Sequence, residues 1–277
     1  MFKYLLLFLL CISSIYGLEN IVSELINDEH SGSLVEVDAS NDFVTSILEP
    51  HTQPFQVSLE VQEIDVISRR CSGAILNNRA ILTSAFCLSN STSVIILAGV
   101  NNRLNFEVTQ QRRIIFSSNY RIHPEYSAIN FTSNIAIVMI QTPFEFNCHV
   151  QAVRLPMEFE NETFAGSIAR STNWGGISET NISSNVLLEL RNSIMDNSQC
   201  NQIYTNIPDS VMCIETNTSN PSLCELATML TLPRACDSRP VLVGIFNFMP
   251  AGCARGLPYG YTRITSFLNW IQENQNP

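Results

Sequence analysis

The chain reads Cys71-Ser72-Gly73-Ala74-Ile75-Leu76 and then Ile81-Leu82-Thr83-Ser84-Ala85-Phe86-Cys87, two apolar segments that each contain or end in a cysteine. A strand-like run, residues 74–83, lies between these two cysteines. Similar short runs of β-branched and apolar residues recur between turn signals, at residues 55–61, 94–100, 112–117, 135–140, 241–248 and 259–264. Their spacing favours an antiparallel sandwich or barrel over βαβ units. Residues 266–275 carry apolar side chains on one helical face, which predicts a C-terminal helix.

The composition excludes several classes of function. The 277 residues suffice for one large unit or two modest domains, and 45% hydrophobic content is too high for a disordered chain. A net charge of −10 argues against nucleic-acid binding, because a phosphate backbone requires a basic face. Residues 18–42 hold acids and no base, which indicates a solvated arm that could dock an Arg-rich partner.

The N-terminus has the pattern of a secretory signal peptide, residues 1–17. Lys3 precedes a short apolar run, residues 5–12, and cleavage is expected near Gly17. That run is too short to cross a bilayer, so we expect a secreted, extracellular protein with no membrane span; a signal anchor is the alternative. Five N-x-S/T sequons fit a glycosylated surface: Asn90, Asn130, Asn161, Asn181 and Asn217.

The cysteines indicate disulfides. Nine are present, and once Cys11 leaves with the signal peptide an even number remains, which in an oxidising compartment predicts four bonds. No C-x-x-C pair or histidine cluster has the spacing of a zinc site. No glycine-rich phosphate loop, acidic calcium loop or amphipathic membrane helix is present either, so we expect neither a metal nor a cofactor.

Several motifs, in order, resemble the trypsin-like serine proteases and cover nearly all of residues 43–277. The stretch quoted above is similar to the family's C-G-G-x-L-I and T/S-A-A-H-C segments. Further matches are residues 54–59, His123-Pro124-x-Tyr126 with residues 134–138, Asn173-Trp174-Gly175, Gly244-Ile245, Gly252-Cys253-Ala254, Tyr261-Thr262 and the helix at residues 267–271. The resemblance implies an all-β fold of two six-stranded antiparallel β-barrels, at about 43–157 and 158–264, with a C-terminal helix at 266–275.

The same resemblance implies how the cysteines pair. The family's bonds correspond to Cys71–Cys87, Cys200–Cys213 and Cys224–Cys253. Cys236 stands where the family has a strand cysteine, but the usual partner position, near Ala169, has none. Because Cys148 is the one cysteine left over, Cys148–Cys236 is our hypothesis for the fourth pair.

At the catalytic positions the chain departs from the family. A triad needs a hydroxyl nucleophile, an imidazole base and a carboxylate that orients the base. Phe86 occupies the histidine position, Asn134 the aspartate position and Thr228 the serine position. Leu226 replaces the glycine of the oxyanion hole, and we expect it to disturb the N–H donors there. An alternative alignment, with residues 237–240 as the degraded nucleophile motif, still leaves Phe86 without a base function.

Activation and substrate binding also look altered. Residues 39–46 lack the basic cleavage site and the glycine pair that family zymogens carry, and the aspartate that pairs with the freed amine is Ala227. Ser222 stands at the acidic position of the trypsin pocket, and Met249 lies in the segment that replaces the S-W-G wall. Tyr259 replaces a pocket glycine. Either these side chains fill the pocket, or the loop is merely repacked.

These observations predict an inactive, secreted serine protease homologue that acts by binding. The expected partner is an extracellular protein, such as an active protease or its substrate. The chain would then be a cofactor, scaffold or decoy in a pathway such as immunity or reproduction. One alternative is a weak hydrolase with a rearranged site that uses Thr228. The other is a bulk secreted structural or storage protein.

Overall fold

The computed structural model describes residues 45–63, 66–159, 162–175, 184–216, 228–233, 239–250 and 256–276. Several predicted features lie outside these residues: the signal peptide, the acidic arm, Ser222, Leu226, the cysteines Cys224, Cys236 and Cys253, and the sequons Asn161, Asn181 and Asn217. Among the described residues, no helix is long and apolar enough to cross a membrane. The same residues contain no group of three His, Cys, Asp or Glu side chains arranged to hold a metal ion.

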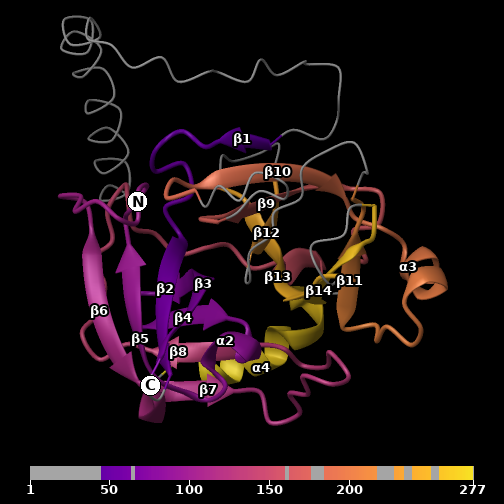
Figure 1. Cartoon of the computed structure of the whole chain (residues 1–277), viewed down its shortest axis with the longest axis horizontal. Coiled ribbons are helices and arrows are strands. Elements are labelled where there is room, and N and C mark those ends of the chain that lie inside the picture. Colours follow the sequence, from indigo (N-terminus) through magenta and orange to yellow (C-terminus); the bar gives the residue numbers. More distant parts are fainter. Residues whose placement is uncertain are drawn as a thin grey trace, which may run out of the picture.

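Two curled antiparallel sheets make up the fold (Figure 1). The first has the strand order β6-β5-β2-β3-β4-β8-β7. Its strands are β2 (Gln56–Glu63), β3 (Val66–Asn77), β4 (Ala80–Thr83), β5 (Ser91–Ala98), β6 (Gln111–Phe116), β7 (Tyr120–Ile122) and β8 (Ala136–Met139). Only the short 3₁₀ turn η1 (Ser117–Asn119) separates β6 from β7, so one bent segment pairs with β5 at one edge and with β8 at the other. If β6 and β7 are counted as one strand, this sheet has the six strands predicted for the first barrel.

The second sheet has the order β1-β10-β9-β12-β13-β14-β11. Its strands are β1 (Thr45–Ile47), β9 (Ile168–Asn173), β10 (Leu188–Ser193), β11 (Val211–Ile214), β12 (Met229–Leu232), β13 (Val241–Phe248) and β14 (Tyr259–Arg263). Beyond β10, Ile194 bridges to Ile214, which brings the end of β10 to the far edge strand β11. β1 is the added strand: it pairs with β10, although residues 45–47 were expected to belong to the first barrel.

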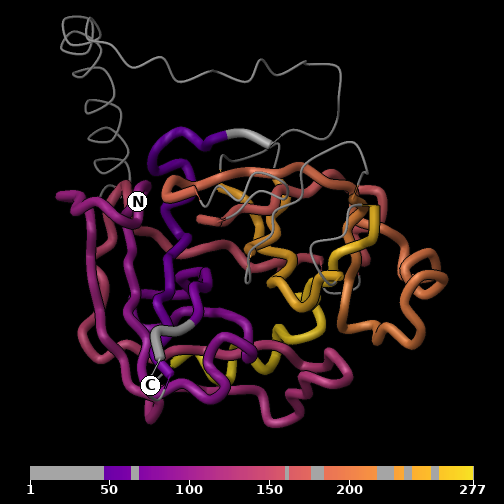
Figure 2. The backbone as a smooth tube through the Cα atoms, in the orientation of Figure 1, coloured from indigo at the N-terminus to yellow at the C-terminus, as the bar shows by residue number. Residues whose placement is uncertain are grey.

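Helical segments among the described residues are short. Besides η1, they are α2 (Ala85–Leu88), η2 (Met157–Phe159), α3 (Asn197–Ile203), η4 (Ile264–Phe267) and α4 (Leu268–Asn274). The last two form the predicted C-terminal helix, and Figure 2 follows its yellow trace back to the first half of the chain. There the Asn77 and Arg121 side chains donate hydrogen bonds to the carbonyls of Gln275 and Asn274.

Each sheet curls around its own apolar interior, and a third apolar layer joins the two. This shared layer contains Leu82 and Ile137 of the first sheet and Ile245 of the second, together with Leu268 and Ile271 of the C-terminal helix. All of these side chains are buried. The helix therefore seals the contact between the halves, as a helix with one apolar face must.

Two disulfides tie local turns to this frame. Cys71–Cys87 joins β3 to α2, and Cys200–Cys213 joins α3 to β11. Both pairings were expected from the family resemblance and are confirmed. Cys148 has no disulfide partner among the described residues, and its expected partner Cys236 lies outside them.

Strand β6 offers a matched test of which face is core. Ile115 is 5% exposed and packs in the interior of the first sheet, whereas its neighbour Ile114 is 52% exposed. We expect Ile115→Ala to lower the free energy of unfolding by about 2–5 kcal/mol, because it leaves a cavity. Ile114→Ala should change it by less than about 0.5 kcal/mol. Urea denaturation measures both, and equal losses would contradict the assigned register.

Candidate catalytic cleft

Phe86 lies in α2, where the Cys71–Cys87 disulfide holds the backbone next to it. The guanidinium of Arg69 lies over the Phe86 ring, 4.8 Å from its centroid. Arg69 also donates to the carbonyl oxygens of Phe86 (2.9 Å) and Ser89 (2.6 Å), and it pairs with Glu63 at 2.6 Å. These contacts fix the ring, which has no group able to accept or release a proton.

Asn134 meets Phe86 across 48 residues of sequence. Its Oδ1 accepts a hydrogen bond from the Phe86 backbone N–H at 2.9 Å, and its Nδ2 donates to Asn247 Oδ1 at 3.2 Å. Asn247 Nδ2 in turn donates to the Phe131 carbonyl oxygen at 2.8 Å. The result is a continuous chain of neutral hydrogen bonds in which every acceptor meets a donor. Asn134 is 3% exposed, so this pairing satisfies a group that would be costly to bury unpaired.

Thr228 belongs to a different network. It lies just before β12 and is 2% exposed, and its Oγ1 is 2.6 Å from the hydroxyl of Tyr261, which also donates to Ser171 Oγ. Burial raises the pKa of Tyr261 to about 12, so this hydroxyl stays protonated. None of the hydrogen bonds found among the described residues links Thr228 to Phe86 or Asn134. The structure thus links Phe86 to Asn134 by a hydrogen bond and buries the Thr228 hydroxyl beside Tyr261 and Ser171 of the second sheet.

The expected pocket-filling residues lie together. Tyr259 is 3% exposed in the core of the second sheet, and Met249 packs against the same cluster. Whether these side chains fill a substrate pocket or belong to a repacked loop stays a prediction. Ser222 lies outside the described residues.

The chain covers the end of β13 with its own side chains. Phe248 packs so closely over Gly260 that a Cβ there would collide with its ring. The Phe248 ring also contacts Phe131, with centroids 4.7 Å apart, and Tyr204, at 5.2 Å. Phe131 comes from the loop before β8, and its backbone has a φ of 57°. The sequence pattern does not predict this contact, because the loop before β8 and the end of β13 are far apart in the chain.

The side chains of the described histidines have other partners. His51 and His149 contact each other, with ring centroids 4.4 Å apart, and His123 packs against Phe267 and Trp270 of the C-terminal helix. None of the three takes part in the hydrogen bonds of Asn134 or Thr228. Of the sequons, Asn90 and Asn130 are exposed, as glycosylation requires.

A protein-family model described as Trypsin matches residues 45–271. The chain belongs to the trypsin family. Brachyurin of Leptuca pugilator is 28% identical over 80% of this chain and 93% of its own length. The collagenase of Hypoderma lineatum is 27% identical over 80% of this chain and 82% of its own length. A solved structure of HL collagenase has a TM-score of 0.71 and 26% identity, and the match covers 82% of this chain and 96% of that one.

The Asn134 amide donates a hydrogen bond to the Asn247 amide, and replacing the donor with an acceptor tests this contact. In Asn134→Asp a carboxylate oxygen faces Asn247 Oδ1, and two acceptors repel each other. If the Asn247 amide turns over, its Nδ2 can donate to the carboxylate, but its Oδ1 then faces the Phe131 carbonyl oxygen and the repulsion moves there. We expect the free energy of unfolding at pH 7 to fall by about 1–3 kcal/mol. The loss should disappear at low pH, because a protonated carboxyl can donate.

The double variant Asn134→Asp with Asn247→Ser is the control for this pairing. A serine hydroxyl can rotate to donate to the carboxylate, so the double variant should be more stable than the sum of the single effects predicts. Denaturation of all four proteins closes the cycle. Strictly additive losses would contradict the proposed complementarity of the two amides.

Proposed function

We propose that this chain is a secreted, catalytically inactive serine protease homologue that works by binding an extracellular protein. The observation that carries the proposal is the neutral chain of hydrogen bonds from Phe86 through Asn134 to Asn247. In the family's motif these positions are associated with an imidazole and a carboxylate, which move and stabilise a proton. Here a phenyl ring and an amide stand in their place.

The position of Thr228 supports the same proposal. A threonine hydroxyl is a weak nucleophile unless a base takes its proton. The described partners of Thr228 Oγ1 lead to Tyr261 and Ser171, and the raised pKa of Tyr261 makes that phenol a poor base at neutral pH. A second line of support is the covered end of β13, where Phe131 and Phe248 take up the surface beside Asn247.

Secretion is proposed on the N-terminal sequence and on the two disulfides, which suit an oxidising compartment. The relatives reported above bear the names of proteases. A homologue that has lost proteolysis can still keep the family's fold and the surface by which it contacts other proteins. Such a surface can act on an active protease as a cofactor, or compete with it as a decoy. We place the chain in an extracellular pathway, such as immunity or reproduction, on this reasoning.

Activity-based labelling tests the absence of catalysis. The purified protein is treated with a fluorophosphonate probe and with peptide substrates, beside Thr228→Ala and an active trypsin as positive control. We expect neither labelling nor turnover from either form of this chain. Labelling of the wild-type protein that maps to Thr228 by peptide mass spectrometry would overturn the proposal and favour a rearranged hydrolase.

Binding is tested on the same protein. We expect this chain to bind a protein of the fluid into which it is secreted, with saturation at sub-micromolar concentration. We also expect the rate of an active protease to change when this chain is added. Surface-based binding kinetics and a protease rate assay measure these effects. A reduced and unfolded sample is the control, since it retains the composition but not the surface. Binding that never saturates, or that the unfolded sample reproduces, would favour a bulk structural or storage role.

A further inference from the structure

Residues 101–103, which we call the strap, follow β5 and join the two halves of the molecule. The Asn101 carbonyl oxygen accepts a hydrogen bond from Trp174 Nε1 at 2.7 Å. Arg103 donates through its side chain to the Trp174 carbonyl oxygen (2.6 Å) and through its backbone to Asn185 (3.0 Å). Because Trp174 and Asn185 belong to the second half, the strap is a polar connection between the halves, separate from the apolar layer.

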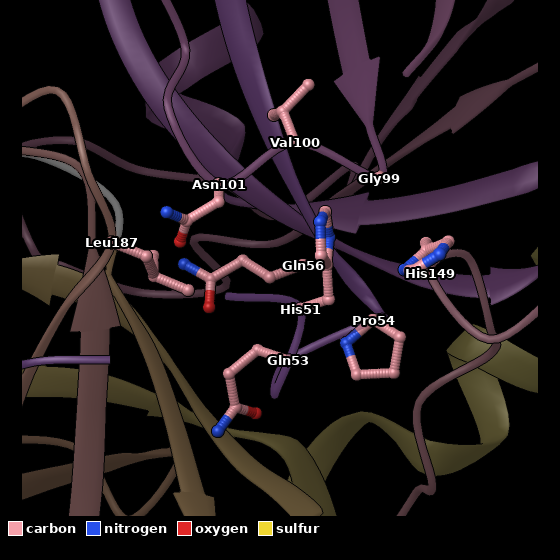
Figure 3. A pocket seen from close by; sticks show the side chains of 9 residues that line it. All are labelled: His51, Gln53, Pro54, Gln56, Gly99, Val100, Asn101, His149 and Leu187. Carbon is pink, nitrogen blue, oxygen red and sulfur yellow. The ribbon is translucent and has the colours of Figure 1, made fainter. Parts of the chain in front are cut away.

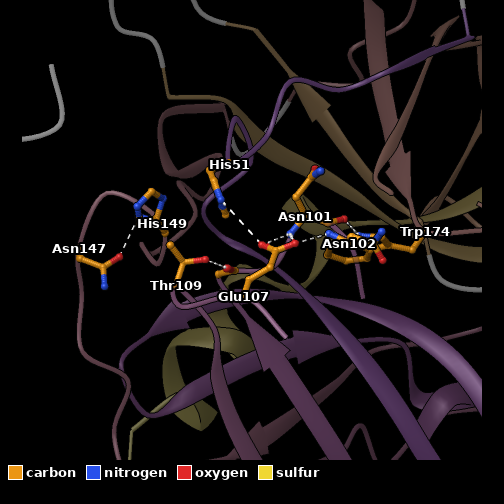
Figure 4. Close-up of polar contacts among 9 residues, drawn as sticks. His51, Asn101, Asn102, Glu107, Thr109, Asn147, His149 and Trp174 are labelled. Carbon is orange, nitrogen blue, oxygen red and sulfur yellow. Dashed lines mark hydrogen bonds and ion pairs between the residues drawn. The ribbon is translucent and has the colours of Figure 1, made fainter. Parts of the chain in front are cut away.

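The carboxylate of Glu107 holds the strap in shape (Figure 4). It accepts hydrogen bonds from the backbone N–H groups of Asn101, at 3.0 and 3.2 Å, and of Asn102, at 2.7 Å. The side chains of its neighbours Phe106 and Val108 are 86% and 95% exposed, whereas that of Glu107 is 21% exposed. Of these three residues, only Glu107 points into the protein. A carboxylate that satisfies two backbone donors fixes a loop that has no strand or helix of its own.

Two histidines from other segments approach this carboxylate. His51, just before β2, places Nε2 at 3.9 Å from Glu107 Oε2. His149, on the segment that leads out of the first sheet, lies edge-on to His51 with ring centroids 4.4 Å apart. Both imidazoles line one small pocket (Figure 3), whose volume is about 10 Å³, roughly the space of one water molecule.

The electrostatics of this cluster favour a neutral His149. Burial and the neighbouring His51 lower the pKa of His149, and Glu107 raises it in opposition. Cys148 is the adjacent titratable side chain on the same segment. His149 Nδ1 is buried without a hydrogen-bond partner among the described residues. A histidine whose pKa is lower when folded contributes stability above its unfolded pKa, near 6.5, and loses that contribution as the pH falls.

The geometry points to an acid-sensitive latch made of His51, Glu107 and His149. One carboxylate can balance one imidazolium, so a second proton leaves two like charges in contact in a half-buried site. The imidazolium groups also compete with the Asn101 and Asn102 amides for the carboxylate. Protonation therefore opens the cluster, frees the strap and loosens the polar connection between the halves. This regulation stands independently of whether the chain is catalytically inactive.

Hydrogen exchange of the strap amides tests the latch. Protection of the Asn101, Asn102 and Arg103 amides, corrected for intrinsic rates, is compared at pH 7.5 and pH 5.5. We expect wild-type protection to fall roughly three- to tenfold at the lower pH. His149→Gln, which cannot charge, should remove the fall. His123→Gln should retain it, because His123 contacts the distant C-terminal helix. An equal fall in the His149 variant, or none in the wild type, would overturn the latch.

In a second measurement His149 itself is unchanged, and only the residues next to it are substituted. The NMR titration of the His149 ring is followed in the wild-type protein and in His51→Gln. Removing the neighbouring positive charge should move the His149 midpoint to higher pH, whereas Glu107→Gln should move it lower. Circular dichroism checks that each variant is folded. Midpoints that stay at the wild-type value would show that the three groups are uncoupled and would refute the proposal.

Discussion

The apolar layer shared by the two sheets is the constraint on which the rest of the structure depends. Neither sheet is closed by its own interior alone, since Leu82, Ile137 and Ile245 turn toward the other half and the helix residues Leu268 and Ile271 complete the layer. Burial of this surface fixes how the halves meet. The polar groups at that junction, from Asn134 to the strap, must then find partners in a geometry that packing has already set.

The group around Asn134 shows how that demand is met without charge. A buried carboxylate is stable only while its charged partner remains. The amide of Asn134 needs no such partner, because the Phe86 backbone N–H donates to its oxygen and Asn247 accepts from its nitrogen. Phe86, Asn134 and Asn247 are thus mutually consistent and form one neutral arrangement.

Much of the fold follows from local patterns. Residues 241–248 are predicted as a strand and coincide with β13, because Val241, Val243 and Ile245 give this short apolar run a high β propensity and the whole strand is buried. The run at 74–83 was expected as one strand but is divided into β3 and β4 by a turn near Asn78. Strands β9 and β10 were missed, because polar residues such as Arg170 and Glu189 interrupt their apolar pattern. Those two residues pair across the sheet, a contact that a single strand cannot reveal.

Residue type and spacing indicate the trypsin-like motifs and place Phe86, Asn134 and Thr228 within them, because the chain carries both locally. The two disulfide pairings follow from the resemblance to the family, and the structure contains both. The folded structure adds that Asn134 bonds to Asn247, that Thr228 lies beside Tyr261 and that His51 meets His149 beside Glu107. Each of these contacts joins residues at least 33 positions apart. Such pairings are set by how the sheets curl and pack, and no local pattern encodes them.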